Sequence, residues 1–319
     1  MGTQADEGAA YDNPLIPNAR LRQIYLSMAQ VRTLALALPS ARRGQRPAAG
    51  TLGLEAALVS ATVDLGAGDM VSDALAGGVV DFLRGTSLKE VLRAGKAGAS
   101  ASRRSRKSGT GVRGLVAECG TAVRLPGIAD AAERIWAALG AAAALKAAAQ
   151  ARVEAKAKAE VKAKATDMAE ARQAGVVVVY ALVDEVPAAL WKRALRFAAE
   201  QGLPVVFVAL PAARARGGKA RAGGVSALAR GCGVPAIAVD ADDAVAIYRV
   251  AQESIGHARM GGGAALMECV PFVLEGAAGK GRQREDAIAA LERTIVQRGV
   301  AARAWMEREA KAFAKRLAK

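Results

Sequence analysis

The stretch GVVVVYALVDEVPAALWKRALRFAAEQGLPVVFVALP, residues 175–211, decides the fold of this chain. It contains two uninterrupted apolar runs, residues 176–183 and 205–210, which are typical of strands covered on both faces. Between them a helix can begin at Pro187 and end at Gly202. Its apolar positions recur every three or four residues: Leu190, Trp191, Ala194, Leu195, Phe197 and Ala198. Strand, helix and strand in such close succession predict a parallel, right-handed βαβ unit.

The rest of the chain continues this alternation of helices and strands. Candidate N-caps are Asn18, Thr51 and either Asp242 or Asp243. We expect helices over 18–38, 54–65, 87–95, 225–230 and 243–260, a strand and a helix within 70–85, strands over 236–240 and 265–274, and two helices between 284 and 319 that separate near Gly299. This pattern predicts an α/β fold with a mainly parallel sheet and helices on both faces.

Composition divides the chain into one large domain and three unusual segments. We expect residues 1–16 to be a flexible tail and residues 17–319 to form a single α/β domain. Within it, residues 96–126 are a basic, Gly- and Ser-rich segment that we expect to be flexible. Residues 151–172 are charged and rich in alanine, which predicts a helix that buries little and protrudes from the body.

Several features of the composition limit the possible location and partners of the protein: its cysteines, its charge and its apolar runs. No apolar run suits a membrane span, the first residues do not resemble a secretory signal, and Cys119, Cys232 and Cys269 are widely spaced. We therefore predict a cytoplasmic protein with three buried thiols. The net charge is +15, but its basic clusters, within 42–46, 103–113 and 214–221, have no aromatic residues between them. Stacking on bases has no platform, so we expect solvated or partner-facing surfaces rather than nucleic-acid binding.

Four stretches, in this order, resemble one enzyme family. They are LRQIYLSMAQVRTLALAL (21–38), GTLGLEAALVSATVDLGAGDMV (50–71), RALRFAAEQGLPVVFV (193–208) and VDADDAVAIYRVAQESIGHARMGGGAALMECV (239–270). They resemble the alpha subunit of thiamine-diphosphate-dependent 2-oxo acid dehydrogenases of the pyruvate, branched-chain and acetoin types. The resemblance runs from about Leu21 to Leu317 and implies a thiamine-diphosphate-binding-like fold.

The resemblance also implies a cofactor site, thiamine diphosphate held through Mg²⁺ at two neighbouring strand ends. In the family the metal ligands come from a Gly-Asp-Gly at the first strand end and an Asn at the next. Alignment places Leu182, Val183 and Asp184 on the Gly-Asp-Gly, and Pro211 or Ala212 on the Asn. Valine and proline side chains cannot ligate a metal. We therefore predict a degenerate site, with neither thiamine diphosphate nor Mg²⁺ bound and with no catalytic residue or metal ligand.

The cofactor-binding positions implied by the resemblance are Val183, Asp184, Glu185 and Pro211. Two interpretations of the acidic pair stay open. A slip of one residue would let Asp184 and Glu185 ligate the metal. Alternatively, the two carboxylates cap the helix that begins near Pro187.

Other family positions also differ. Leu54 stands for the Gln of Gly-Gln-Glu-Ala, residues 75–78 (Leu-Ala-Gly-Gly) stand for Tyr-Arg-Gly-His, and the catalytic and regulatory loop is shortened to residues 275–282. His257, the single histidine, falls mid-helix, where a surface or packing role is expected rather than a catalytic one.

Three hypotheses of function remain. The leading one is a degenerate alpha-subunit homologue that acts as a structural or regulatory subunit, with a beta-like subunit or a second copy of itself as partner; Gly140 and the alanines after it suit close helix packing there. The second is an active thiamine-diphosphate-dependent oxidoreductase that decarboxylates a 2-oxo acid together with a beta subunit. The third is a basic protein that binds nucleic acid or an acidic partner.

Overall fold

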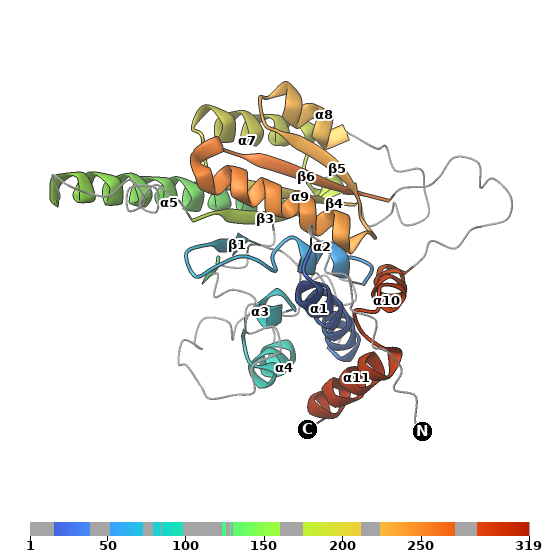
Figure 1. The fold of residues 1–319 in the computed structure, drawn as a ribbon. Helices are drawn as coiled ribbons and strands as arrows, with labels where there is room; N and C mark the ends of the chain where they lie inside the picture. Colours follow the sequence, from blue (N-terminus) through green and yellow to red (C-terminus); the bar gives the residue numbers. More distant parts are fainter. Residues whose placement is uncertain are drawn as a thin grey trace, which may run out of the picture.

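The computed structural model describes residues 16–38, 52–72, 79–83, 85–97, 123–125, 128, 130–159, 175–211, 224–271 and 286–318. Within these residues, six strands form one sheet in the order β2-β1-β3-β4-β6-β5, and every pair of neighbours is parallel (Figure 1). The strands are β1 Met70–Ser72, β2 Val123–Arg124, β3 Val177–Leu182, β4 Val205–Leu210, β5 Ala236–Asp240 and β6 Ala265–Val270. The predicted α/β fold with a mainly parallel sheet is confirmed.

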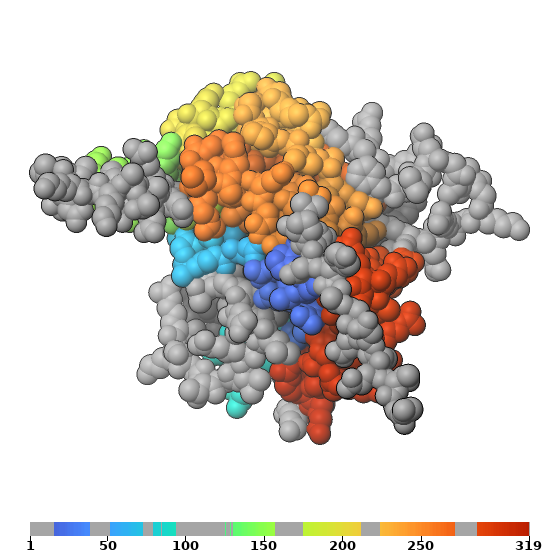
Figure 2. All heavy atoms as spheres, in the orientation of Figure 1, coloured from blue at the N-terminus to red at the C-terminus, as the bar shows by residue number. Residues whose placement is uncertain are grey.

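Helices cover both faces of the sheet, as predicted. On one face, α9 (Ala244–His257) packs directly on the strands, and the hydrophobic cluster there extends through a further layer of helices: α1 (Asn18–Ala37), α2 (Glu55–Ser60), α3 (Val79–Leu83), α4 (Leu88–Ala97), α10 (Ala287–Gln297) and α11 (Arg303–Leu317). The other packs against α5 (Ala131–Ala159), α7 (Ala188–Glu200) and α8 (Gly224–Gly231). In Figure 2, α9 lies on the visible side of the molecule, and α1 adjoins the C-terminal helices α10 and α11.

Alternation along the central strands explains how one sequence serves both faces. Val178, Tyr180 and Leu182 of β3 point into the first hydrophobic cluster, and Val177 and Val179 point into the second. Because successive side chains of a strand point to opposite faces, a strand between two helical layers must be apolar throughout. Every residue of β3, β4 and β6 is accordingly buried.

The predicted unit of strand, helix and strand is confirmed as β3, α7 and β4. The register pairs Val177 with Val205 at one end and Leu182 with Leu210 at the other. Helix α7 buries Trp191, Ala194, Leu195 and Ala198 as its pattern predicts. Phe197 was wrongly placed in that stripe: its side chain is 39% exposed and lies against Trp136 of α5, with ring centroids 5.8 Å apart.

Most helix boundaries agree with the sequence pattern, and the differences have local causes. The N-cap of α1 is Pro17 rather than Asn18, and that of α9 is Asp243, which accepts bonds from the amides of Val245 and Ala246. Helix α2 ends at Ser60, short of the predicted residue 65, because the Thr62 amide bonds the Val59 carbonyl and tightens the chain into turns. Thr51 lies outside the described residues.

The end of α9 is also more irregular than predicted. A π-helical turn, η5 (Ala258–Gly262), follows it, and Gly261 there has a φ of 86°. Only glycine adopts this backbone conformation at little cost, so the glycines between α9 and β6 make this connection possible.

The segments 96–126 and 151–172 are partly described. Residues 123–124 of the segment 96–126, for which no stable element was predicted, form β2, because they pair with Met70 and Val71 of β1. Helix α5 extends away from the sheet (Figure 1), and its residues 151–156 are exposed except for half-buried Val153. Residues 160–172, the remainder of the predicted protruding helix, lie outside the described residues.

Three further predictions concern burial. Ile16, assigned to the tail, is fully buried in the core. Cys269 is buried as predicted, whereas Cys232 is only half-buried and Cys119 lies outside the described residues. Among the described helices, none has the length and hydropathy that a membrane crossing requires.

Candidate functional site

The carboxyl ends of β3 and β4 form the edge where the sequence places the candidate site. Since Leu182 pairs with Leu210, the next residues, Val183 and Pro211, follow at adjacent strand ends. In an open parallel sheet this edge is where ligands bind. The structure therefore brings together the two positions that the family resemblance matched to metal ligands.

The residues after β3 form a single 3₁₀ turn, η4 (Val183–Glu185). The Val183 side chain packs with the hydrophobic cluster beneath α5 and α7, so it continues the alternation of β3. Asp184 is exposed, and Glu185 is half-buried. Of the four predicted positions, Val183 and Pro211 therefore offer apolar surface, and the carboxylates come only from the turn.

Glu185 faces a buried cation. Its Oε2 lies 3.5 Å from Nη2 of Arg134, whose side chain is 1% exposed. Arg134 also donates from Nε to the Tyr180 carbonyl, at 3.1 Å, and from Nη1 to the Ile128 carbonyl, at 2.8 Å. The guanidinium thus joins the start of α5, the end of β3 and the η4 turn.

The helix-capping interpretation of the acidic pair is wrong. The N-cap of α7 is Pro187, which makes no side-chain cap bond, and the first turn of α7 contains no acidic residue. Proline at this position supplies an extended backbone, with φ of −58° and ψ of 143°, that leads directly into the helix. Glu185 turns back toward Arg134 instead.

The residues at this edge do not fit a magnesium ion that holds a diphosphate. Mg²⁺ requires oxygen ligands in near-octahedral geometry, and Val183 and Pro211 supply none from their side chains. Glu185 is already paired with a guanidinium, whose positive charge opposes a second cation nearby. No group of three or more His, Cys, Asp or Glu side chains suited to a metal occurs among the residues that the structure describes.

Comparison with family models identifies the relatives of this chain. Residues 32–319 match the model described as "Dehydrogenase E1 component". The chain belongs to this family. A comparison with curated proteins gave no match. The dehydrogenase E1 family uses thiamine diphosphate. In this E1 chain, the described residues Val183 and Pro211, which follow β3 and β4, offer no side-chain oxygen.

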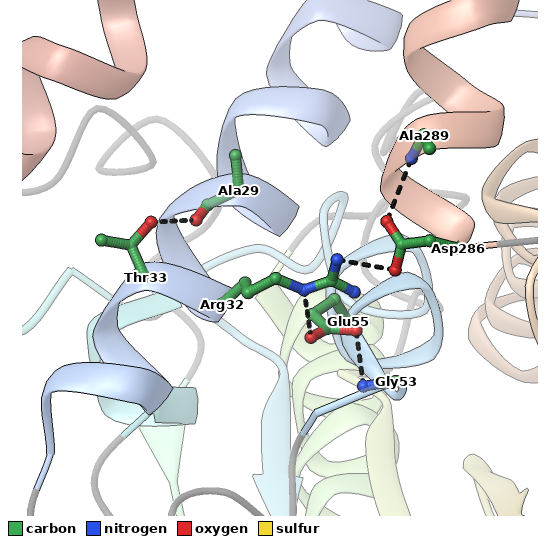
Figure 3. Close-up of polar contacts among 7 residues, drawn as sticks. All are labelled: Ala29, Arg32, Thr33, Gly53, Glu55, Asp286 and Ala289. Atoms are coloured by element: carbon green, nitrogen blue, oxygen red, sulfur yellow. Dashed lines mark hydrogen bonds and ion pairs between the residues drawn. The ribbon is translucent and has the colours of Figure 1, made fainter. Parts of the chain in front are cut away.

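Two acidic residues of the E1-like stretch 50–71, Glu55 and Asp69, are buried, and both form structural hydrogen bonds and ion pairs. Glu55 is fully buried; its Oε1 accepts from Arg32 Nε at 2.9 Å and its Oε2 accepts from the Gly53 amide at 2.8 Å (Figure 3). Arg32 also reaches Asp286 at 2.6 Å, and Asp286 caps α10 through the Ala289 amide. This chain of contacts ties α1, α2 and α10 together.

Electrostatics favour that arrangement. Burial by itself lowers the pKa of the Arg32 guanidinium, but its bonds to Glu55 and Asp286 outweigh burial, and the net effect raises this pKa. A guanidinium held between two carboxylates keeps its charge at every pH at which the protein folds.

Asp69, the second retained acid, lies at the opposite, amino edge of the sheet. Its carboxylate is 1% exposed; it accepts from the amides of Val176 and Gly66 and pairs with Arg259 at 2.7 Å. It therefore fastens the entries to β1 and β3 to the turn after α9.

The remaining E1 positions divide into described and undescribed ones. Leu54, in place of glutamine, is buried at 3% exposure. His257 is exposed at the end of α9 with its ring over Gly262, where an added Cβ would lie 2.3 Å from the ring, so it is a packing residue. Residues 75–78 and 275–282 and the three basic clusters lie outside the described residues.

Sequence reasoning missed two buried charges, Arg134 and Glu268. Glu268 of β6 is 2% exposed and accepts from the amides of Val225 and Ser226, so it caps α8. Each charge had a signal: Arg134 shares a helical stripe with apolar Ala138 and Ala142, and Glu268 interrupts an apolar strand. A charge in an apolar pattern indicates a buried partner, although the pattern does not identify that partner.

Proposed function

We propose that this chain is a 2-oxo acid dehydrogenase alpha-type subunit that has lost the metal-dependent cofactor site and acts as a structural or regulatory subunit in the cytoplasm. The observation that carries the proposal is the position of Val183 and Pro211, which directly follow the paired strand ends Leu182 and Leu210. In the active members that the sequence resembles, these positions supply a carboxylate and an amide to the metal. Here they supply an aliphatic side chain and a pyrrolidine ring.

The charge at this edge supports the same conclusion. An open divalent site needs carboxylates whose negative charge is not already neutralised. The turn after β3 carries two carboxylates, Asp184 and Glu185. Of these, Glu185 faces the guanidinium of Arg134, which is almost fully buried. Among the described residues of this turn, one exposed carboxylate, Asp184, then remains, and one monodentate ligand does not hold Mg²⁺ against its hydration shell.

The partner in this proposal is a beta-like dehydrogenase subunit or a second copy of the chain. Membership of the dehydrogenase E1 family supports an oligomer. The exposed small residues of α5, Gly140, Ala143 and Ala144, support close approach of another helix. We do not propose nucleic acid as the partner.

Calorimetric titration tests the proposal directly. Thiamine diphosphate is titrated into the purified chain with MgCl₂ present, and again with EDTA, alone and with any beta-like subunit that co-purifies. We expect no magnesium-dependent heat in any of these titrations. An E1 alpha subunit with the intact Gly-Asp-Gly and Asn ligands serves as the positive control.

A matched variant makes a negative result informative. Val183→Asp with Pro211→Asn restores the two ligand types at the same strand ends, and circular dichroism confirms that the variant folds. Magnesium-dependent binding at micromolar concentration by the unmodified chain would overturn the proposal. If Asp184→Asn then abolished that binding, Asp184 would be a metal ligand, as the alignment shifted by one residue predicts. The hypothesis of an active enzyme would then take the place of the present proposal.

A further inference from the structure

We infer that the Arg134 guanidinium is a built-in cation that fixes the carboxyl end of β3, so that this edge is ordered without a metal ion. This inference rests on the proposed loss of the metal site. It assigns a positioning role to a side chain that has no part in any cofactor contact described above.

The first support is geometric. Arg134 contacts three separate segments: Ile128, which precedes α5; Tyr180, near the end of β3; and Glu185, in η4. Only two of these three segments adjoin each other along the chain. A planar guanidinium with five N–H groups can serve several acceptors in fixed directions, which a lysine ammonium on its flexible stem cannot reproduce.

The second support is the burial of charge. Arg134 is among the largest fully buried side chains, and a guanidinium keeps its proton in proteins. A charge removed from water must be compensated by acceptors and by an opposite charge. The carbonyls of Ile128 and Tyr180 supply two acceptors, and Glu185 supplies the negative charge.

The third support is the position of the counter-ion. Glu185 belongs to the turn that leaves β3, at the strand end next to Pro211 of β4. Its pairing with Arg134 fixes where the chain leaves the sheet and holds its carboxylate toward the guanidinium. The same pairing removes Glu185 from the set of ligands available to a metal, so one interaction has both effects.

A double-mutant cycle tests the role without any ligand. Arg134→Met, Glu185→Gln and the double variant are unfolded in urea, once with EDTA and once with MgCl₂. We expect Glu185→Gln to raise the unfolding equilibrium constant about tenfold, because it removes the carboxylate of half-buried Glu185 that faces the buried Arg134 guanidinium. In the double variant, the unfolding equilibrium constant should rise by less than the product of the two single-variant factors. Mg²⁺ should not change the stability of the unmodified chain or of any of the three variants.

Hydrogen exchange separates positioning from general stability. In Arg134→Met, and in Arg134→Lys if the methionine variant fails to fold, amides of residues 183–186 should exchange at least about tenfold faster than in the unmodified chain. Amides of α10, on the other side of the sheet, should change much less. Equal acceleration in both regions, or effects of Arg134 and Glu185 that simply multiply, would overturn the inference.

The two proposals can fail separately. Binding of thiamine diphosphate with magnesium would refute the lost cofactor site, whatever the mutant cycle gives. A cycle without coupling would refute the positioning role of Arg134 even if no cofactor bound.

Discussion

Replacing Glu55 with glutamine removes the buried negative charge between α1 and α2 while it preserves the shape of the side chain. Glu55 is fully buried, and each of its oxygens accepts one bond, from Arg32 at 2.9 Å and from the Gly53 amide at 2.8 Å (Figure 3). In the glutamine variant one of these oxygens becomes an NH₂ group. That group is itself a donor, so it cannot accept either bond.

The magnitude follows from these contacts. A hydrogen bond to a charged group contributes about 1.5–3 kcal/mol, and breaking a fully buried ion pair costs about 3–5 kcal/mol. Arg32 is 26% exposed and keeps its contact with Asp286, so the loss belongs near the lower end. We expect Glu55→Gln to lower the free energy of unfolding by about 2 kcal/mol.

Asp286→Asn is the matched control, because it removes the other carboxylate that contacts Arg32. The Asp286 side chain is 44% exposed, and exposed ion pairs contribute less than about 1 kcal/mol. Asparagine also caps helices about as well as aspartate, so the bond from Ala289 survives. We expect a loss of about 0.5 kcal/mol for this variant.

Urea unfolding followed by circular dichroism measures both variants, with equal m-values as the condition for comparison. The reasoning is refuted if the two substitutions cost the same, or if Glu55→Gln changes stability by less than about 0.5 kcal/mol. Combining Glu55→Gln with Arg32→Met should cost less than the sum of the two, since no unpaired guanidinium remains.

Two further predictions concern a glycine contact and a buried thiol. Gly175→Ala should destabilise the chain by more than about 2 kcal/mol, because a Cβ there would lie 2.0 Å from the Gly68 carbonyl oxygen. Gly140→Ala, with open space around the Cβ, should stabilise α5 by about 0.5–1 kcal/mol. If urea unfolding showed the reverse order of stability for the two variants, this packing would be contradicted. Burial, with Glu268 and Asp240 adding to it, raises the pKa of the Cys269 thiol from 9.0 to about 12. The folded state therefore holds this proton more tightly than the unfolded state does. The stability advantage of the unmodified chain over Cys269→Ala is complete below about pH 9 and should shrink as the pH rises from 9 toward 12. An advantage that stays constant between pH 8 and pH 10.5 in urea unfolding would contradict the raised pKa.

Local pattern was sufficient for the central unit and for most helices. The β-branched runs of β3 and β4, the proline before α7 and the glycine after it specify strand, helix and strand through short-range sterics alone. The family resemblance added the pairing of two distant strand ends, and the register of Leu182 with Leu210 agrees with the separation that the alignment preserves.

Two kinds of feature were beyond the sequence pattern. Val123 and Arg124 form a strand only because β1 lies beside them, so no local preference marks them. Phe197 follows the apolar spacing of α7, yet its ring is partly exposed and contacts Trp136. The buried face of α7 therefore includes fewer residues than the apolar spacing predicts.

The sequence by itself determined the layers of this protein, because apolar periodicity depends only on the order of the side chains along the chain. It also places valine and proline directly after the two strand ends that the family resemblance matches to metal ligands. The tertiary structure alone decided the partners of the buried charges: Arg134 with Glu185, Arg32 with Glu55 and Asp286, and Asp69 with Arg259. Such pairs join segments that are distant along the chain, and only the folded arrangement sets which carboxylate lies within reach of which guanidinium.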